Sequence, residues 1–121
     1  TTDDARRALE HLLTEAEANP TLALCLDFEF ESHDAAQPLS LMQVAVGNSG
    51  VHIFDAVHVR GILRMAGLDS RLSEVTSVKV LHDARADSKM LRLNLSDEDF
   101  AFESIFDTQV AHEVLVGEWQ A

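Results

Sequence analysis

The chain has 121 residues, 46% of them hydrophobic, and a formal net charge of −12. This length and apolar content favour one compact domain with a single hydrophobic core over a disordered chain. We expect neither a signal peptide nor a membrane span, because no charged-then-apolar leader and no run of about eighteen apolar residues occurs. The lone cysteine, Cys25, cannot form an internal disulfide. We expect it to be a small buried hydrophobe in an intracellular protein.

The acidic composition argues against a nucleic-acid partner, since phosphate-binding proteins usually display clustered lysine and arginine that replace counterions. The argument weakens if many of the carboxylates converge on divalent metal ions, which supply the positive charge that a phosphate needs. Composition alone therefore indicates an acidic soluble domain and does not define its function.

The N-terminal segment is predicted to be an amphipathic helix over about residues 5–16. Its apolar residues recur at helical spacing, Asp3 and Asp4 stand where the helix dipole favours anions, and Pro20 follows the helix. Residues 22–30 then alternate strictly between two faces, which predicts a strand. Because both faces of this strand begin with apolar residues, we expect it to be central in a sheet.

The next segments are predicted to complete a three-strand meander. A polar loop that contains His33 and Asp34 leads to a second strand over residues 39–46. The sequence Gly-Asn-Ser-Gly at 47–50 supplies turn chemistry before a third strand over residues 51–54.

The second half of the chain alternates between helices and short strands. We expect a helix over residues 57–68, then a strand and helix at 78–81 and 84–93, and a last strand and helix at 105–106 and 108–116. The predicted order is helix, three strands, helix, strand, helix, strand, helix. This order is typical of a mixed α/β domain, and we interpret residues 1–121 as one domain.

Two carboxylates on the first strand are the first candidate site. Asp27 and Glu29 are two residues apart, so both side chains project from the same face, close enough to share one metal ion. They also stand at the carboxyl end of a central strand, where open α/β sheets bind their ligands. The alternative is that the strand emerges into solvent at Asp27, with Glu29 and Glu31 as surface residues.

A second candidate follows the strand at 78–81. Asp87 falls about one turn into the next helix and can point back across the sheet edge towards Asp27, while Met90 and Leu91 face the core. We interpret Asp83 as the N-cap of that helix and His82 as a structural residue that is hydrogen-bonded at the strand end.

The remaining charged residues have simpler interpretations. Asp107 precedes the last helix, and an N-cap is the default interpretation, with a carboxylate at the edge of the site as the alternative. The stripe Arg85, Lys89, Arg92 lies on the side of its helix away from Asp87, so we favour a solvated surface over a phosphate-binding patch.

Taken together, five segments resemble the ribonuclease D branch of the DEDD-type 3′-5′ exonucleases, which includes Werner-type and Egalitarian-like proteins. Leu-Cys-Leu-Asp-Phe-Glu-Phe resembles the first exonuclease motif, and His-Asp-Ala-Arg-Ala-Asp resembles the second. The strand with Gln43, the strand that follows it and a Phe-Asp-Thr-Gln segment are also similar. The five segments lie at residues 24–30, 38–45, 51–56, 79–91 and 105–111.

The resemblance implies a ribonuclease H-like fold, in which helices flank a five-stranded mixed sheet. It implies that Asp27, Glu29 and Asp87 are catalytic residues and metal ligands for two Mg²⁺ or Mn²⁺ ions. The expected activity is hydrolysis of nucleic acid from the 3′ end, with RNA preferred over DNA, in RNA processing. The residues expected to support the site are Gln43, His82, Asp83 and Asp107.

The chain also departs from the family pattern. The family's third motif, on a later helix, supplies a fourth carboxylate together with a tyrosine or histidine. This chain has no tyrosine and no aspartate after Asp107. We therefore expect a domain that lacks its C-terminal helix with the third motif, which leaves catalysis by these residues alone in doubt. A missing C-terminal segment or a protein partner would cover the resulting apolar surface. Trp119 would belong either to that surface or to a frayed terminus.

Two other functions remain open. The first is a catalytically inactive exonuclease-like module that binds nucleic acid or acts as a scaffold in an RNA-processing complex. The second is a metal phosphohydrolase that uses the doublet His82-Asp83, which requires an all-α fold. A strand over residues 22–30 would exclude the second function.

Overall fold

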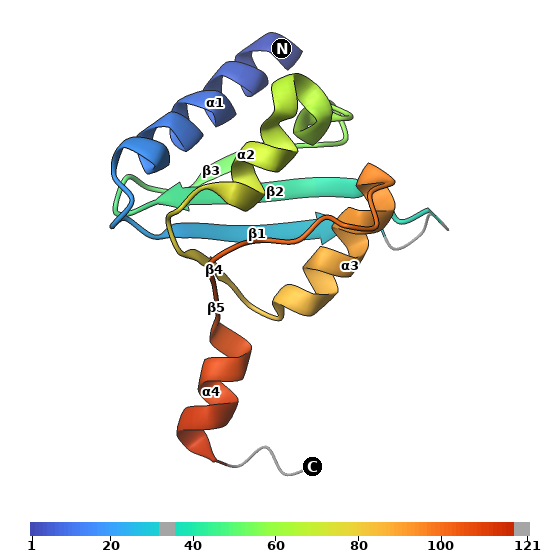
Figure 1. The fold of residues 1–121 in the computed structure, drawn as a ribbon. Helices are drawn as coiled ribbons and strands as arrows, with labels where there is room; N and C mark the ends of the chain where they lie inside the picture. Colours follow the sequence, from blue (N-terminus) through green and yellow to red (C-terminus); the bar gives the residue numbers. More distant parts are fainter. Residues whose placement is uncertain (32–35, 118–121) are drawn as a thin grey trace.

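The computed structural model describes residues 1–31 and 36–117 and shows an α/β fold (Figure 1). The predicted loop residues His33 and Asp34, and Trp119, lie outside the described residues. No helix in the described part is long and apolar enough to cross a membrane. The elements in chain order are α1 (Thr2–Ala18), β1 (Leu24–Phe30), β2 (Leu39–Val46), β3 (His52–Asp55), η1 (Ile62–Gly67), α2 (Leu68–Glu74), β4 (Lys79–Leu81), α3 (Ala84–Leu95), β5 (Ile105–Asp107) and α4 (Thr108–Val116).

The sheet has five strands in the order β3-β2-β1-β4-β5. The meander β1, β2 and β3 is antiparallel, whereas β4 pairs in parallel with β1 on one side and with β5 on the other. This arrangement confirms the predicted five-stranded mixed sheet with β1 at its centre. The strand at Leu24–Phe30 excludes the all-α phosphohydrolase.

Helix α1 begins earlier than the apolar spacing predicts, because its first turn is capped by polar groups. Thr1 and Asp4 form a capping box in which each side chain accepts a hydrogen bond from the other's backbone N–H. The face that carries Leu9, Leu12 and Leu13 is buried against the sheet. Figure 1 shows α1 and α2 lying over this side of the sheet.

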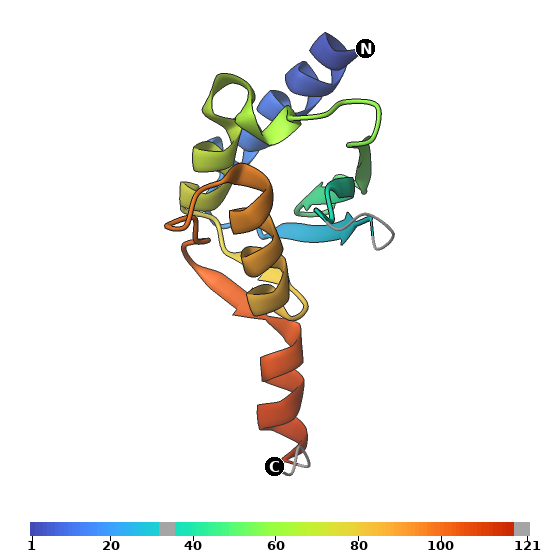
Figure 2. The same ribbon diagram turned by 90° about the vertical axis from the view of Figure 1, so that its right-hand side faces the viewer.

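The two faces of the sheet differ in cover. On β1, Leu24, Leu26 and Phe28 are buried, while the residues between them are exposed. Cys25 is therefore exposed, and the expectation of a buried cysteine is wrong. We call the side of the sheet on which Cys25 lies the open face. Helix α4 does not cover it, since α4 has no buried residue and extends away from the rest of the molecule in both views (Figures 1 and 2).

The predicted helix over residues 57–68 is wrong. Turns occupy its first part, and a 3-10 helix, η1, precedes the short helix α2. Glycines at 61 and 67 and Ala66 adopt left-handed backbone angles (φ 74°, 70° and 50°), which an α-helix cannot contain. The apolar residues Ile62 and Leu63 are buried, as their pattern indicates, but from a tighter turn.

A buried lysine supports the junction between α2 and β4. The Lys79 side chain is fully buried, and its Nζ donates a hydrogen bond to the carbonyl of Val75 at the end of α2. Burial lowers the pKa of Lys79, and the charge of Glu103 partly offsets this effect. The sequence does not predict this arrangement, because nothing in the pattern distinguishes Lys79 from a surface residue.

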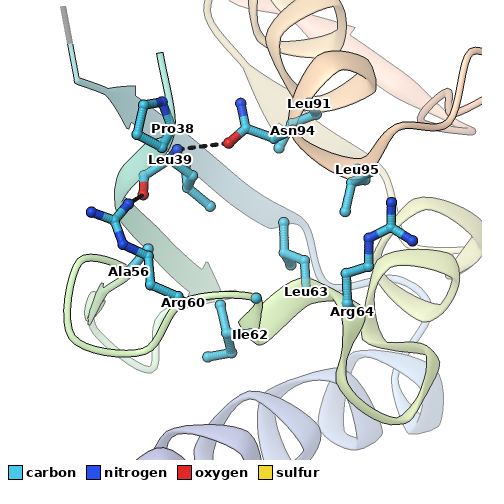
Figure 3. A pocket seen from close by; sticks show the side chains of 11 residues that line it. Pro38, Leu39, Ala56, Arg60, Ile62, Leu63, Arg64, Leu91, Asn94 and Leu95 are labelled. Carbon is cyan, nitrogen blue, oxygen red and sulfur yellow. Dashed lines mark hydrogen bonds between the residues drawn. The ribbon is translucent and has the colours of Figure 1, made fainter. Parts of the chain in front are cut away.

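A small hollow marks where β2 meets α3. Figure 3 shows Pro38 and Leu39 on one side and Leu91 and Asn94 on the other, with Arg64 at the rim. Its volume of about 90 Å³ is well below the roughly 300–1,000 Å³ typical of ligand pockets. The Asn94 amide ties the two elements together: its oxygen accepts from Leu39 N at 2.8 Å, and its nitrogen donates to the carbonyls of Met90 and Gln37 at 2.9 and 3.2 Å.

Replacing Asn94 by alanine is expected to lower the free energy of unfolding by about 1–2 kcal/mol, because three hydrogen bonds are lost at a half-buried position. Urea unfolding measures the change. The control is Arg64→Ala at the rim of the same hollow, where the exposed side chain is expected to matter little. Equal losses for the two variants would contradict the role of Asn94.

Candidate active site at the carboxyl edge of the sheet

Asp27 and Glu29 lie on the open face at the carboxyl end of β1, and both are exposed. In the antiparallel register Asp27 stands opposite Gln43 of β2, and Glu29 stands opposite Leu41. Directly opposed residues point to the same side of a sheet, so the Gln43 amide is a close neighbour of the Asp27 carboxylate. A shallow hollow of about 130 Å³ is lined by Asp27, Gln43 and Cys25, among others.

Asp87 approaches this edge from α3. Its side chain is half-buried, and its pKa rises from 3.8 to about 6. The largest cause is burial, and the negative charges of Asp27, Asp83 and Asp107 add to it. The effect of Asp27 on this pKa means that α3 brings Asp87 within electrostatic range of the end of β1. Four aspartates, from β1, β5, α3 and the residue before α3, therefore share one region.

The prediction that the Asp83 side chain caps α3 is wrong. The residue stands at the N-cap position, but its backbone is left-handed (φ 58°, ψ 61°) and its side chain makes no capping hydrogen bond. The N-terminal amides of α3 are bound by Asp107 instead: the carboxylate of Asp107 accepts from Asp83 N at 3.0 Å and from Ala84 N at 2.8 Å. A cap supplied from 23 residues away leaves no local pattern in the sequence.

Asp107 is also the N-cap of α4, which confirms the default interpretation. Its Oδ1 accepts from Gln109 N at 2.9 Å and from Val110 N at 3.5 Å. Partial burial tends to raise the pKa of Asp107, but the four backbone amides that it binds outweigh this and hold the pKa below its usual value. The carboxylate is therefore ionised and fixed by backbone donors.

His82 has the structural role that its position suggests. Its Nδ1 lies 2.9 Å from the Thr108 hydroxyl oxygen, and that hydroxyl donates to the Leu81 carbonyl at 3.2 Å. A hydroxyl has only one proton to donate, so Nδ1 of His82 must be the donor in their contact. The imidazole thus joins the end of β4 to the start of α4.

The acidic side chains at this edge have no counter-charge. Within residues 1–31 and 36–117, the carboxylates of Asp27, Glu29, Asp83 and Asp87 form no hydrogen bond or ion pair. Arg85 and Lys89 are exposed on α3, as predicted for a solvated stripe, and no ion pair between described residues involves them. Arg92, the third residue of the stripe, is instead half-buried, and its guanidinium donates to the Phe100 carbonyl at 3.3 Å. Of the carboxylates at this edge, the half-buried Asp87 is the one whose charge its surroundings disfavour, and a bound cation would relieve that.

Oxygen donors of this kind suit hard divalent cations such as Mg²⁺ and Mn²⁺. The chemistry of the donors therefore fits a metal site. The geometry fits it only in part, since no three acidic, histidine or cysteine side chains in the described part of the chain lie close enough to hold a metal ion together. Asp27, Glu29 and Asp87 are the residues available to such a site.

A five-stranded mixed sheet with acidic residues at its carboxyl edge is the arrangement that the exonuclease motifs imply. Residues 2–118 match the sequence profile of a family of 3′-5′ exonucleases. The chain belongs to this 3′-5′ exonuclease family, and its resemblance to the DEDD-type enzymes of the ribonuclease D branch is confirmed. No curated protein matches the chain closely enough to be significant.

Three solved structures have a similar fold. The EXO domain of Aedes aegypti Nibbler has a TM-score of 0.70 at 17% identity, over 92% of this chain and 53% of its own. Trypanosoma brucei RNase D in complex with RNA U12 has a TM-score of 0.66 at 23% identity, over 91% and 37%. The EXD2 exonuclease domain has a TM-score of 0.63 at 23% identity, over 92% and 55%. The chain thus spans about half the length of the Nibbler and EXD2 domains.

Replacing Asp87 by asparagine is expected to stabilise the metal-free protein above about pH 6. On folding, the pKa of Asp87 rises from 3.8 to about 6, so the folded state holds this proton more tightly. That stabilisation is complete below pH 3.8 and is lost as the pH rises through about 6. The asparagine variant has no such loss, so above about pH 6 its free energy of unfolding is expected to exceed that of the wild type. We expect a difference of about 1 kcal/mol, because solvent screens the charge of a half-exposed group.

Urea unfolding of the wild type and the Asp87→Asn variant at about pH 4 and about pH 7.5 measures the difference. The control is Asp99→Asn, which makes the same chemical change in the exposed acidic loop. An advantage of equal size for Asp87→Asn at both pH values would contradict a raised pKa.

Proposed function

We propose that this chain forms the greater part of a metal-dependent exonuclease active site that removes nucleotides from the 3′ end of RNA. The proposal rests on one observation: the carboxylates at the carboxyl edge of β1 have no partner among the described residues. Helix α3 brings Asp87 close enough to this edge for their negative charge to raise its pKa. The family match supports 3′-5′ exonuclease chemistry. A charged group of this kind has no evident structural use.

The substrate and the metal are supported by similar proteins. RNase D of Trypanosoma brucei was solved with RNA U12 and with GMP, and the EXD2 domain was soaked with Mg and GMP and with Mn and dGMP. Asp27, Glu29 and Asp87 would hold Mg²⁺ or Mn²⁺ here. Two bound ions would supply the positive charge that stabilises the attacking water and the leaving 3′ oxygen.

The chain's own residues would orient this site. Gln43, opposite Asp27, has an amide that can donate to the Asp27 carboxylate or to a phosphate oxygen. Because burial raises the pKa of Asp87 to about 6, a proton competes with a cation for this carboxylate below about pH 6. The half-buried position of Asp87 therefore couples metal binding to pH.

The proposal predicts Mn²⁺-dependent release of mononucleotides from a 3′-labelled RNA by the protein at its full natural length. Asp27→Asn is expected to lower the rate by about 100-fold or more, because a ligand charge at the metal is lost. Asp99→Asn, the same change in the exposed loop, is expected to leave the rate near that of the wild type. A DNA strand of the same sequence, tested in parallel, is expected to be cleaved more slowly.

A second function is favoured by one observation: the described residues bring no three potential ligands close enough to hold a metal ion. The chain would then be an inactive exonuclease-like module that binds nucleic acid or organises an RNA-processing complex. A correctly folded full-length protein that binds RNA but releases no nucleotide from either strand would favour this second function over the first.

Metal binding without catalysis gives an independent prediction. Mn²⁺ at about a hundredfold excess over its Kd is expected to stabilise the folded chain by about 2.7 kcal/mol, which raises Tm. Asp87→Asn is expected to lose most of that gain, and Asp99→Asn is expected to keep it. Thermal unfolding with and without Mn²⁺ measures both changes. The absence of a shift in the wild type would contradict a metal site in this chain.

A further inference from the structure

One carboxylate accepts hydrogen bonds from two helices at the edge of the candidate site. Asp107 Oδ1 accepts from Asp83 N at 3.0 Å, Gln109 N at 2.9 Å and Val110 N at 3.5 Å, and Oδ2 accepts from Ala84 N at 2.8 Å. An ionised carboxylate offers about four lone-pair sites. Three amides bind Oδ1 and one binds Oδ2, so only about one site, on Oδ2, stays free for another ligand. Asp107 differs in this respect from Asp27, Glu29 and Asp87, which have no described partner.

The start of α3 depends on this carboxylate. Its N-cap residue, Asp83, is left-handed and provides no capping hydrogen bond of its own. A non-glycine residue in this conformation costs about 1–2 kcal/mol, and the first amides of a helix need acceptors from outside it. Asp107 supplies an anion at the positive end of the helix dipole, and this stabilises the sharp turn from β4 into α3.

The position of Asp107 is itself fixed by the sheet. Leu81, the last residue of β4, pairs with Asp107 in the parallel register of β4 and β5. The next residue along, Thr108, donates to the Leu81 carbonyl and contacts His82. Sheet register therefore determines the place of the carboxylate, and the carboxylate determines where α3 begins.

We propose that Asp107 is a positioning residue: by capping α3 from β5, it sets the place of Asp87, one turn into that helix. The residue does not bind the metal or touch the substrate. This assignment rests on the proposed exonuclease function for its catalytic consequence. Its structural consequence, the tie between Asp107 and the first amides of α3, is independent of that function.

The structural consequence is tested by amide hydrogen exchange of the metal-free chain, followed by NMR. In Asp107→Ala, exchange at Ala84 is expected to become roughly tenfold faster or more, because a charge-assisted hydrogen bond is lost. Asp107→Asn, which keeps an acceptor oxygen, is expected to recover part of the protection and provides the measurement if the alanine variant does not fold. Unchanged exchange at Ala84 in a folded variant would overturn the proposal.

A matched control is available at the end of β3. Asp55 also accepts hydrogen bonds from two backbone amides, Val57 N at 3.0 Å and His58 N at 3.2 Å, but it lies two strands away from Glu29 in the sheet. Asp55→Ala is expected to speed exchange at Val57 and His58 and to leave exchange at Ala84 unchanged. A general loss of stability would instead affect Ala84 in both variants, which would count against the proposal.

The catalytic consequence is tested on the full-length protein with 3′-labelled RNA. Asp107→Ala is expected to lower kcat by about tenfold to 100-fold, the range seen when residues that orient metal ligands are lost. KM is expected to stay near its wild-type value, and Asp107→Asn should restore part of kcat. A wild-type kcat in the variant, together with faster exchange at Ala84, would overturn the positioning role. If the wild type itself cleaves nothing, the exonuclease proposal fails, and exchange at Ala84 alone decides whether Asp107 positions α3.

Discussion

The parallel pairing of β4 with both β1 and β5 is the constraint on which the candidate site depends. Parallel strands end at the same edge of a sheet, so Asp27 on β1, the turn after β4 and Asp107 on β5 meet there. The residues come from segments that are far apart in the sequence. Helix α3 then carries Asp87 back to this edge, and the cap from Asp107 sets where that helix begins.

Part of the chain's negative charge is concentrated at this edge, where the carboxylates repel one another. Several carboxylates occupy one region in which no lysine or arginine of the described residues pairs with them, and the pKa of Asp87 rises as a result of burial and of its neighbours' charges. Asp107 lies in the same region, yet its pKa falls because backbone amides bind it. Side chains of the same chemistry thus differ in their partners: Asp107 binds backbone amides, whereas the other carboxylates stay available to a cation.

The open face distinguishes this chain from a domain whose sheet is covered on both faces. Parallel strands are normally buried on both faces, yet Phe106 on the parallel strand β5 is 51% exposed, and α4 has no buried residue. Ile53, on the antiparallel strand β3, is 66% exposed. Asp27 and Glu29 lie on the same face as these apolar side chains. The acidic edge and the uncovered apolar surface therefore belong to one side of the molecule.

The sequence alone determined the class of fold, the central strand and the identity of the acidic candidates, because strand periodicity and the ordered motifs are local properties. Local patterns failed where the backbone turns left-handed, as at Gly61 and Ala66, and where burial depends on cover from elsewhere, as for Cys25 and Lys79. Only the tertiary structure decided which aspartate caps α3. Asp83 has the expected local position, but the hydrogen bonds come from Asp107, whose place is set by the pairing of β4 with β5.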